Sequence, residues 1–215
     1  MEKLFGLFGA VLSESLVVIG KTLAKLGMDE NILYWTNTDE GRKVLAEVTE
    51  VFVVKYREAN GFLKLISGKE EITLDPTDGT ETLAKAKDLF VWIDDCFTSW
   101  GLGLPATATP ATKVQVHELV KNGRFNQFFN SVGGNLDQLC LTQHQIKQFV
   151  QKYGGWLRTS EYATLFLFKQ GEEFFIAYVD LDDDGGLRVD VYRFSNDSVW
   201  YAVYRPRVVL PQLAA

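Results

Sequence analysis

The stretch EYATLFLFKQGEEFFIAYVDLDDDGGLRVDVYRF, residues 161–194, indicates the fold most directly. Its three runs of aromatic and β-branched residues are separated by QG and by DDDGG, which are typical of tight turns between paired strands. A fourth run, VWYAVYRPRVVL at 199–210, follows SNDS. The pattern predicts a four-stranded antiparallel meander. Apolar residues fall on both strand faces, so we expect helices to cover one side of the sheet.

The N-terminal part of the chain has helical spacing. Residues 3–27 place apolar side chains at intervals of three and four, and Gly27 is a natural helix end. A second helix is expected within residues 29–50, with Thr38 as its cap and Leu45 and Val48 facing inward. These two segments predict a helical start to the chain.

Short strands should follow. VFVVKYR at 51–57 and FLKLIS at 62–67 predict a hairpin, and EEITLDP at 70–76 predicts a third strand that stops at Pro76. Residues 77–100 return to helical spacing, with an expected inner stripe that comprises Leu83, Ala86, Leu89, Phe90 and Ile93.

The loop GLGLPATATPAT, residues 101–112, is uncharged and rich in glycine and proline, which is typical of a hinge or boundary. A helix is expected over 113–132, with a weak point at Gly123. Another is expected over 142–153, where Thr142 and Gln145 have the spacing of a capping box.

These elements predict an α+β protein. Its helical N-terminal half would contain a small β-hairpin, and its C-terminal four-stranded antiparallel meander would pack against helices. Residues 1–100 and 113–215 would be two regions joined by the 101–112 loop, or parts of one domain.

Composition narrows the function classes. Of 215 residues, 47% are hydrophobic and 23% charged, as in globular proteins, and the net charge is −6. That charge repels phosphate backbones and argues against nucleic-acid binding. Cys96 and Cys140 do not form a C-x-x-C pair, so we interpret them as buried thiols of a cytoplasmic protein.

The apolar N-terminus lacks a basic start and a small-residue cleavage site, and Ser13, Glu14 and Ser15 interrupt it. It therefore predicts neither a signal peptide nor a transmembrane helix. Packing in the core is the main interpretation of residues 3–27, and peripheral membrane contact is the alternative.

The segment DLDDDGG at 180–186 has two interpretations. Asp180, Asp182 and Asp184 precede Gly185 as in a calcium loop. Calcium, bound weakly at these residues, is therefore the one cofactor that the sequence suggests. The acidic twelfth position of such a loop is Val191 here, and Arg188 brings a cation close. A tight hairpin turn explains the same residues and is the interpretation that we favour.

Two further groups could serve an enzyme of unrecognised type. Asp94 and Asp95 are paired acids, although neighbours on a helix do not face each other. Cys140 and His144 could act as nucleophile and base, or bind zinc together with Cys96. Leucines on both sides of Cys140 favour an inert buried thiol instead. His117 is the second histidine. The sequence contains no motif that identifies a specific reaction.

Aromatic and arginine residues are concentrated in the C-terminal runs. Interfaces favour both residue types. The candidate interface residues are Trp200, Tyr201, Tyr204, Arg193 and Arg205. The competing interpretation places the rings in the core and the arginines at strand edges.

The run WLRTSEYATLFLFKQGEEFFIAYV, with GGLRVDVYRFSNDSVWYAVYRPRVVL after it, resembles a group of short hypothetical proteins from uncultured bacteria of the candidate phyla. In these proteins a T-x-x-YA-x-x-F strand opens a terminal meander, a glycine-centred hairpin follows, and a Trp lies near the last strand. The resemblance covers the last quarter of the chain. It implies a bacterial or phage-like source and brings no activity with it.

The sequence thus leads to one main functional expectation. It is a non-catalytic protein-binding or scaffolding protein that binds a protein partner or itself. The alternatives are an enzyme that uses Asp94 and Asp95 or the acidic residues 180–184, and a weak calcium-binding module.

Overall fold

The computed structural model describes residues 18, 21–23, 25–27, 31–68, 70–133, 135–158 and 163–213, without the side chains of residues 33, 53, 54 and 56–60. The chain divides into two compact units, Met1–Lys55 and Tyr56–Ala215. The 101–112 loop lies inside the second unit, and its role as a hinge stays a prediction.

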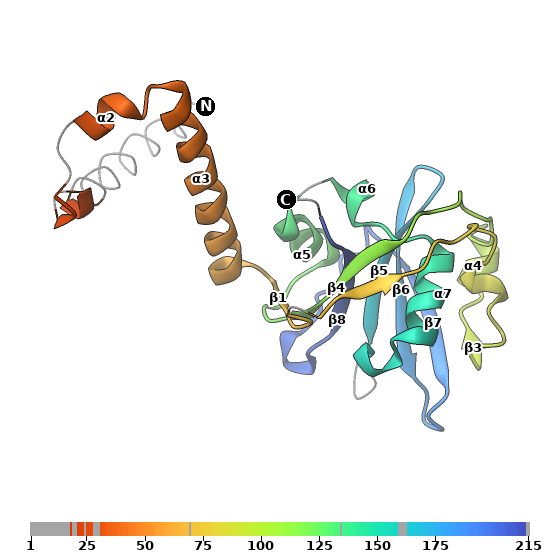
Figure 1. Cartoon of the computed structure of the whole chain (residues 1–215). Helices are drawn as coiled ribbons and strands as arrows, with labels where there is room; N and C mark the ends of the chain where they lie inside the picture. Colours follow the sequence, from red (N-terminus) through yellow and green to blue (C-terminus); the bar gives the residue numbers. More distant parts are fainter. Residues whose placement is uncertain are drawn as a thin grey trace. The chain divides into compact units, whose positions relative to one another are not determined.

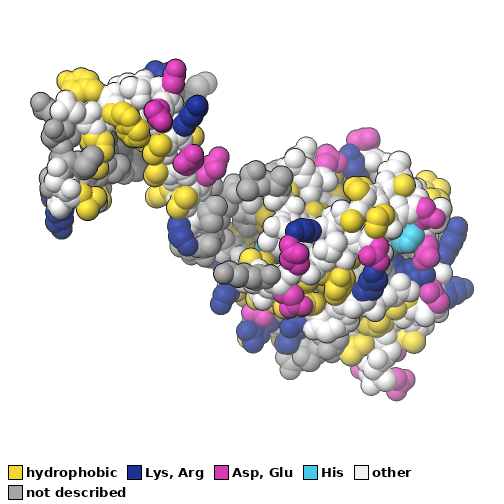
Figure 2. Space-filling view, viewed as in Figure 1, with side chains coloured by type: hydrophobic (Ala, Val, Ile, Leu, Met, Phe, Trp, Pro, Cys, Tyr) yellow, Lys and Arg dark blue, Asp and Glu magenta, His cyan; other side chains and the backbone are white. Residues whose placement is uncertain are grey.

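The first unit contains helix α2 (Asn31–Trp35) and most of helix α3 (Asp39–Asn60). The Thr38 hydroxyl accepts the Gly41 N–H at 3.1 Å, which confirms the predicted cap. VFVVKYR belongs to α3, so the predicted strand at 51–57 is wrong. Leu45 and Val48 are exposed rather than inward, and Figure 2 shows hydrophobic side chains along the surface of this helix. Most of the predicted 3–27 helix, with its proposed membrane contact, lies outside the described residues.

The second unit is built on one eight-stranded mixed sheet with the order β1-β4-β8-β5-β6-β7-β3, in which β2 also pairs with β4. The strands are β1 (Leu63–Leu65), β2 (Ile72–Leu74), β3 (Trp92–Ile93), β4 (Thr112–Leu119), β5 (Thr164–Gln170), β6 (Glu173–Leu181), β7 (Leu187–Arg193) and β8 (Arg207–Pro211). β5 with β8 and β3 with β7 are parallel pairs, and the remaining pairs are antiparallel.

The predicted fold class is therefore wrong. Strands β5, β6 and β7 form an antiparallel meander, but β8 returns across the sheet and inserts between β4 and β5. The reason is Trp200, which is only 7% exposed and packs against Phe125, Tyr178 and Tyr192. Its burial carries the chain across one face of the sheet, and a new strand begins only after Pro206.

The N-terminal half is also not the predicted helical body, because it supplies β1, β2 and β3 to the same sheet. Residues 77–100 form only a 3-10 turn, η1 (Leu83–Lys85), strand β3 and a short helix α4 (Cys96–Ser99). Residues 113–119 belong to β4 rather than to a helix, because Val114 and Val116 face one core while Leu119 faces the other.

Helical segments cover both faces of the sheet, not one (Figure 1). One face carries Phe166 and Phe168 against α4, η1 and α7 (Gln143–Lys152). The opposite face carries Leu165 and Leu167 against α5 (Phe125–Val132) and α6 (Leu136–Leu139). Each buried Phe or Leu side chain contributes roughly 1.5–3 kcal/mol of transfer free energy, so burial on both faces stabilises the sheet.

Candidate functional site

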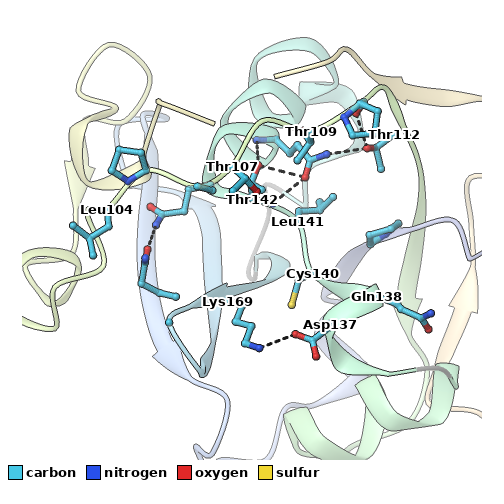
Figure 3. A pocket seen from close by; sticks show the side chains of 18 residues that line it. Leu104, Thr107, Thr109, Thr112, Asp137, Gln138, Cys140, Leu141, Thr142 and Lys169 are labelled. Carbon is cyan, nitrogen blue, oxygen red and sulfur yellow. Dashed lines mark hydrogen bonds and ion pairs between the residues drawn. The ribbon is translucent and has the colours of Figure 1, made fainter. Parts of the chain in front are cut away.

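A hollow lies where β5 and β8 end and β4 begins. It has a volume of about 630 Å³, within the size range of ligand pockets. Its lining comprises residues 104–107, 109, 110, 112, 137, 138, 140–143, 145, 169–171 and 211. Figure 3 shows the loop that carries Thr107 and Thr109 on one side, with Asp137, Gln138 and Lys169 opposite.

Hydrogen bonds fix the loop wall, which extends from Leu104 to Thr112. Thr109 exchanges two backbone hydrogen bonds with Thr77, at 2.8 and 3.0 Å, and the two hydroxyls lie 2.8 Å apart. The Ala106 N–H donates to the Gly79 carbonyl at 2.9 Å. Gly79 has φ +76°, and a Cβ there would lie 2.3 Å from the Ala106 oxygen. Only glycine therefore allows this close approach.

The buried amide of Gln143 forms part of the pocket wall. Its Oε1 accepts the Leu83 N–H at 2.9 Å, and its Nε2 donates to the Leu102 carbonyl at 2.6 Å. Nε2 also lies 3.2 Å from the side-chain amide of Gln170. One side chain thus joins η1, the 101–112 loop and the end of β5, which makes the wall rigid.

The start of α7 forms the next part of the wall. Thr142 Oγ1 accepts the Gln145 N–H at 3.2 Å, and Gln145 Oε1 accepts the Thr142 N–H at 2.9 Å. This is the predicted capping box, and the structure confirms it. The structure adds a link that spacing does not reveal, because Gln145 Nε2 donates to the Thr112 hydroxyl at 2.9 Å.

The charges of the pocket are paired with each other. Lys169 Nζ lies 2.9 Å from Asp137 Oδ1 and 3.4 Å from Glu172, and it lies 5.2 Å from the centre of the Phe174 ring. The hydrogen bond to Asp137 raises the pKa of Lys169. Asp137 and Lys169 are the two charged members of the lining, so the lining has no net charge.

The structure does not join Cys140 to His144. The Cys140 thiol donates to the Leu136 carbonyl at 3.3 Å, and burial raises its pKa to about 12. His144 instead places Nδ1 3.2 Å from Asp78 Oδ1. Cys96 donates to Asp94, and this hydrogen bond raises its pKa. Within the described part of the chain, no three His, Cys, Asp or Glu side chains could hold a metal ion together.

Asp94 and Asp95 lie at the start of α4, outside the pocket lining. Asp94 Oδ1 accepts the Cys96 N–H at 2.8 Å, and Oδ2 accepts the Val191 N–H at 3.3 Å. Asp94 thus ties α4 to β7. His117 lies on β4, also outside the lining, and burial lowers its pKa to about 4. Of the predicted catalytic residues, only Cys140 lines the pocket, whereas Asp94, Asp95, His117 and His144 do not.

The 180–186 segment forms the predicted hairpin turn between β6 and β7. Asp180 pairs with Arg188 at 2.7 Å across the two strands. Asp182 Oδ1 accepts the N–H groups of Asp184 and Gly186, at 3.1 and 2.6 Å, and Gly185 has φ +83°. These bonds account for Asp180 and Asp182 in the turn, while Asp184 is exposed at its tip. The calcium site stays a prediction.

The five predicted interface residues separate into three places. Trp200 is in the core, and Arg193 lies over the ring of Trp100, 4.8 Å from its centre. Tyr201 and Tyr204 are exposed beside Arg205, around the 3-10 turn η3 (Ala202–Tyr204). Only these last three therefore share a surface.

Sequence reasoning missed the pocket residues Thr107, Thr109, Gln138 and Lys169. Thr107 and Thr109 lie in the uncharged 101–112 loop, which predicted a hinge or boundary, and no pattern in the sequence marks Gln138 or Lys169. The pairing of that loop with Thr77 and Gly79 depends on contacts 27 to 32 residues apart, such as Thr77 with Thr109. No local pattern contains such contacts.

Among the described residues, no helix is both long and apolar enough to cross a bilayer. The resemblance of the C-terminal run to candidate-phyla proteins stays a prediction. No protein-family model, curated protein or solved structure matches this chain.

Proposed function

We propose that the second unit is a non-catalytic protein-binding module, and that its pocket binds a short, uncharged segment of another polypeptide. The observation that carries this proposal is the lining itself. It presents hydroxyls and amides in a hydrogen-bonded frame, and its single charged pair is internally neutralised. A cytoplasmic location belongs to the same proposal, and the two free thiols of Cys96 and Cys140 support it.

A peptide segment suits this lining better than other neutral ligands do. Peptide groups carry one donor and one acceptor per residue, and a hydroxyl such as that of Thr107 and an amide such as that of Gln138 can match both. Pro105, Pro110 and Pro211 add apolar wall for the side chains of a ligand. None of the eighteen described lining residues is aromatic, so the stacking surface that a planar ring ligand would use is missing.

The lack of net charge supports an uncharged segment. A charged ligand group would lose water without gaining an opposite charge, because Asp137 and Lys169 already neutralise each other. The protonated Cys140 thiol supports binding rather than covalent catalysis, since the thiolate is the nucleophilic form.

Amide NMR spectra recorded with a pool of blocked, uncharged hexapeptides test this proposal. We expect shift changes at Thr107, Gln138 and Gln170, which lie on three separate walls. A pool of blocked peptides with acidic side chains should leave these signals in place. Shifts elsewhere in the second unit, with these three unchanged, would contradict the proposal.

A further inference from the structure

Three arginines gather at the amino ends of β5 and β8, the opposite ends of the strands from the pocket. Arg207 begins β8, and its Nη1 donates to the carbonyls of Leu157 and Gly155, at 3.2 and 3.5 Å. Its guanidinium lies 6.0 Å from the centre of the Trp156 ring. Arg158 donates through Nε to the Tyr204 carbonyl at 3.2 Å. These contacts fix two guanidinium groups against the protein.

The third arginine is held by a strained backbone. Arg205 has φ 54°, and it is the one non-glycine residue with positive φ that the described residues contain. Its guanidinium lies 3.1 Å from Glu118 Oε1. A non-glycine residue held in the left-handed region requires support from its surroundings, and such residues cluster at functional sites.

Positive charge is in excess here, although the whole chain carries −6. Burial lowers the pKa of Arg207, and the charges of Arg158 and Arg205 lower it further. Among the described residues, Glu118 is the carboxylate that acts against this effect. Among the described residues, three cations thus face one acid, and in Figure 2 several Lys and Arg side chains lie over this part of the second unit together with some Asp and Glu.

Exposed apolar side chains lie beside these arginines. Tyr201, Val203 and Tyr204 are 48%, 76% and 38% exposed, and the two tyrosine rings lie edge to face at 6.5 Å. Their segment is held in place because Trp200 pairs with Gly123 through two backbone hydrogen bonds, and the Ala202 N–H donates to Asn122 Oδ1 at 2.8 Å. The backbone that carries these side chains, which we call the ridge, is therefore anchored to residues 122 and 123.

We propose that this arginine–tyrosine surface (Arg158, Arg205, Arg207, Tyr201, Val203 and Tyr204) binds an acidic segment of a partner protein. Carboxylates of the segment pair with the arginines, and an apolar side chain between them packs on Tyr201 and Val203. Arg and Tyr are the residue types that dominate binding energy at protein interfaces. Nucleic acid fits less well, because phosphate contacts along a strand require a longer basic track than three arginines provide.

The test uses a fluorescein-labelled, blocked peptide of Asp and Glu with a central Trp-Leu pair, measured by fluorescence anisotropy with the full chain. We expect Arg158→Gln and Arg205→Gly each to weaken binding about tenfold, because each removes a charge-assisted pair. Arg193→Gln removes the same charge at the end of β7 and should change binding less than about twofold. Glycine adopts φ 54° freely, so Arg205→Gly should fold normally, and a thermal melt verifies this.

A second peptide separates an acidic protein segment from any polyanion. Replacing its Trp-Leu pair with Gly-Ser should weaken binding about tenfold, because the contact with the ridge is lost. Equal binding of the two peptides, or tighter binding of a single-stranded oligonucleotide, would overturn the proposal. So would identical affinities of the parent, Arg205→Gly and Arg193→Gln. These variants leave the pocket residues untouched, so failure here says nothing about the pocket.

Discussion

The two ends of the parallel pair β5 and β8 differ in how their polar groups are used. At the carboxyl ends, most hydrogen-bonding groups of the polar side chains already have partners within the protein, as in Thr142, Gln143 and Gln145. The single charged pair there, Lys169 with Asp137, has no net charge. At the amino ends, arginines outnumber acids and apolar side chains are exposed.

This difference shows how one sheet can present two kinds of surface. The strands themselves are buried on both faces, so what binds is decided by the loops that leave each end. The carboxyl end has a rigid, neutral frame, whereas the amino end has charge and exposed rings. Perturbations of one end should therefore leave binding at the other unchanged.

The largest expected effect is at Gly79. Gly79→Ala places a Cβ 2.3 Å from the Ala106 oxygen at φ +76°, so the loop wall must move. We expect the free energy of unfolding to fall by about 4 kcal/mol, and pocket binding to be lost. Gly101→Ala is the matched control, because φ is +69° there but nothing lies within 4 Å. It should cost about 1 kcal/mol in urea denaturation. Equal losses would show that the loop does not depend on this close approach.

The next effect concerns pH and comes from His117, which is adjacent to Glu118. Its pKa is about 4 in the folded chain and 6.5 ordinarily, so the unfolded chain binds the extra proton first as the pH falls. Stability is fully present above pH 6.5 and should decrease by about 3 kcal/mol as the pH falls through 4.

His117→Gln should remove this part of the slope in denaturation curves recorded across that range. The pH scan is best made with Asp190→Asn added both to the parent and to the His117→Gln variant. Burial raises the pKa of Asp190 to about 6, which gives a slope of opposite sign: its contribution is lost as the pH rises toward 6. A parent slope that survives His117→Gln would place the acid sensitivity elsewhere.

Gln143→Ala should have a smaller effect that is confined to the carboxyl end. It leaves the Leu83 N–H and the Leu102 carbonyl without their partner, at a cost of about 2 kcal/mol. Hydrogen exchange should speed up at Leu83. Binding of the acidic peptide to the arginine–tyrosine surface should stay unchanged, and a weakened affinity there would break the claim that the two ends are independent.

The smallest effect is expected for Thr142→Ala. It removes the acceptor for the Gln145 N–H and should cost about 1 kcal/mol in thermal denaturation. Thr98→Ala on α4 is the control at an exposed helical threonine and should cost less than about 0.5 kcal/mol. A loss at Thr142 no larger than at Thr98 would mean that the capping box does not stabilise α7.

Local chemistry predicted some of these features correctly. The Thr142–Gln145 box, the Thr38 cap and the turn at 182–185 depend on residues within four positions of each other, and the structure confirms all three. Leu83, Ala86 and Phe90 are core residues, as the predicted stripe implied, although the expected helix is only a short 3-10 turn.

Other features were predicted wrongly, and only some of these errors arise from tertiary contacts. The β-branched residues of VFVVKYR indicated a strand, but their element is the long helix α3. KVQVHEL alternates with a period of two, so a strand was the better interpretation for 113–119. Neither the insertion of β8 nor the pocket follows from local spacing, because both join residues that are far apart along the chain.

The most direct test of the central claim is a selection of phage-displayed random dodecapeptides on the parent protein, followed by binding to two variants. Thr107→Trp fills the pocket from its loop wall, whereas Ala108→Trp adds the same ring one residue further on, outside the lining. Uncharged selected peptides should bind the Ala108→Trp variant as they bind the parent and should fail to bind the Thr107→Trp variant, whereas acidic peptides held by the arginine–tyrosine surface should bind both variants. Uncharged peptides that bind both variants equally would contradict a binding role for the pocket.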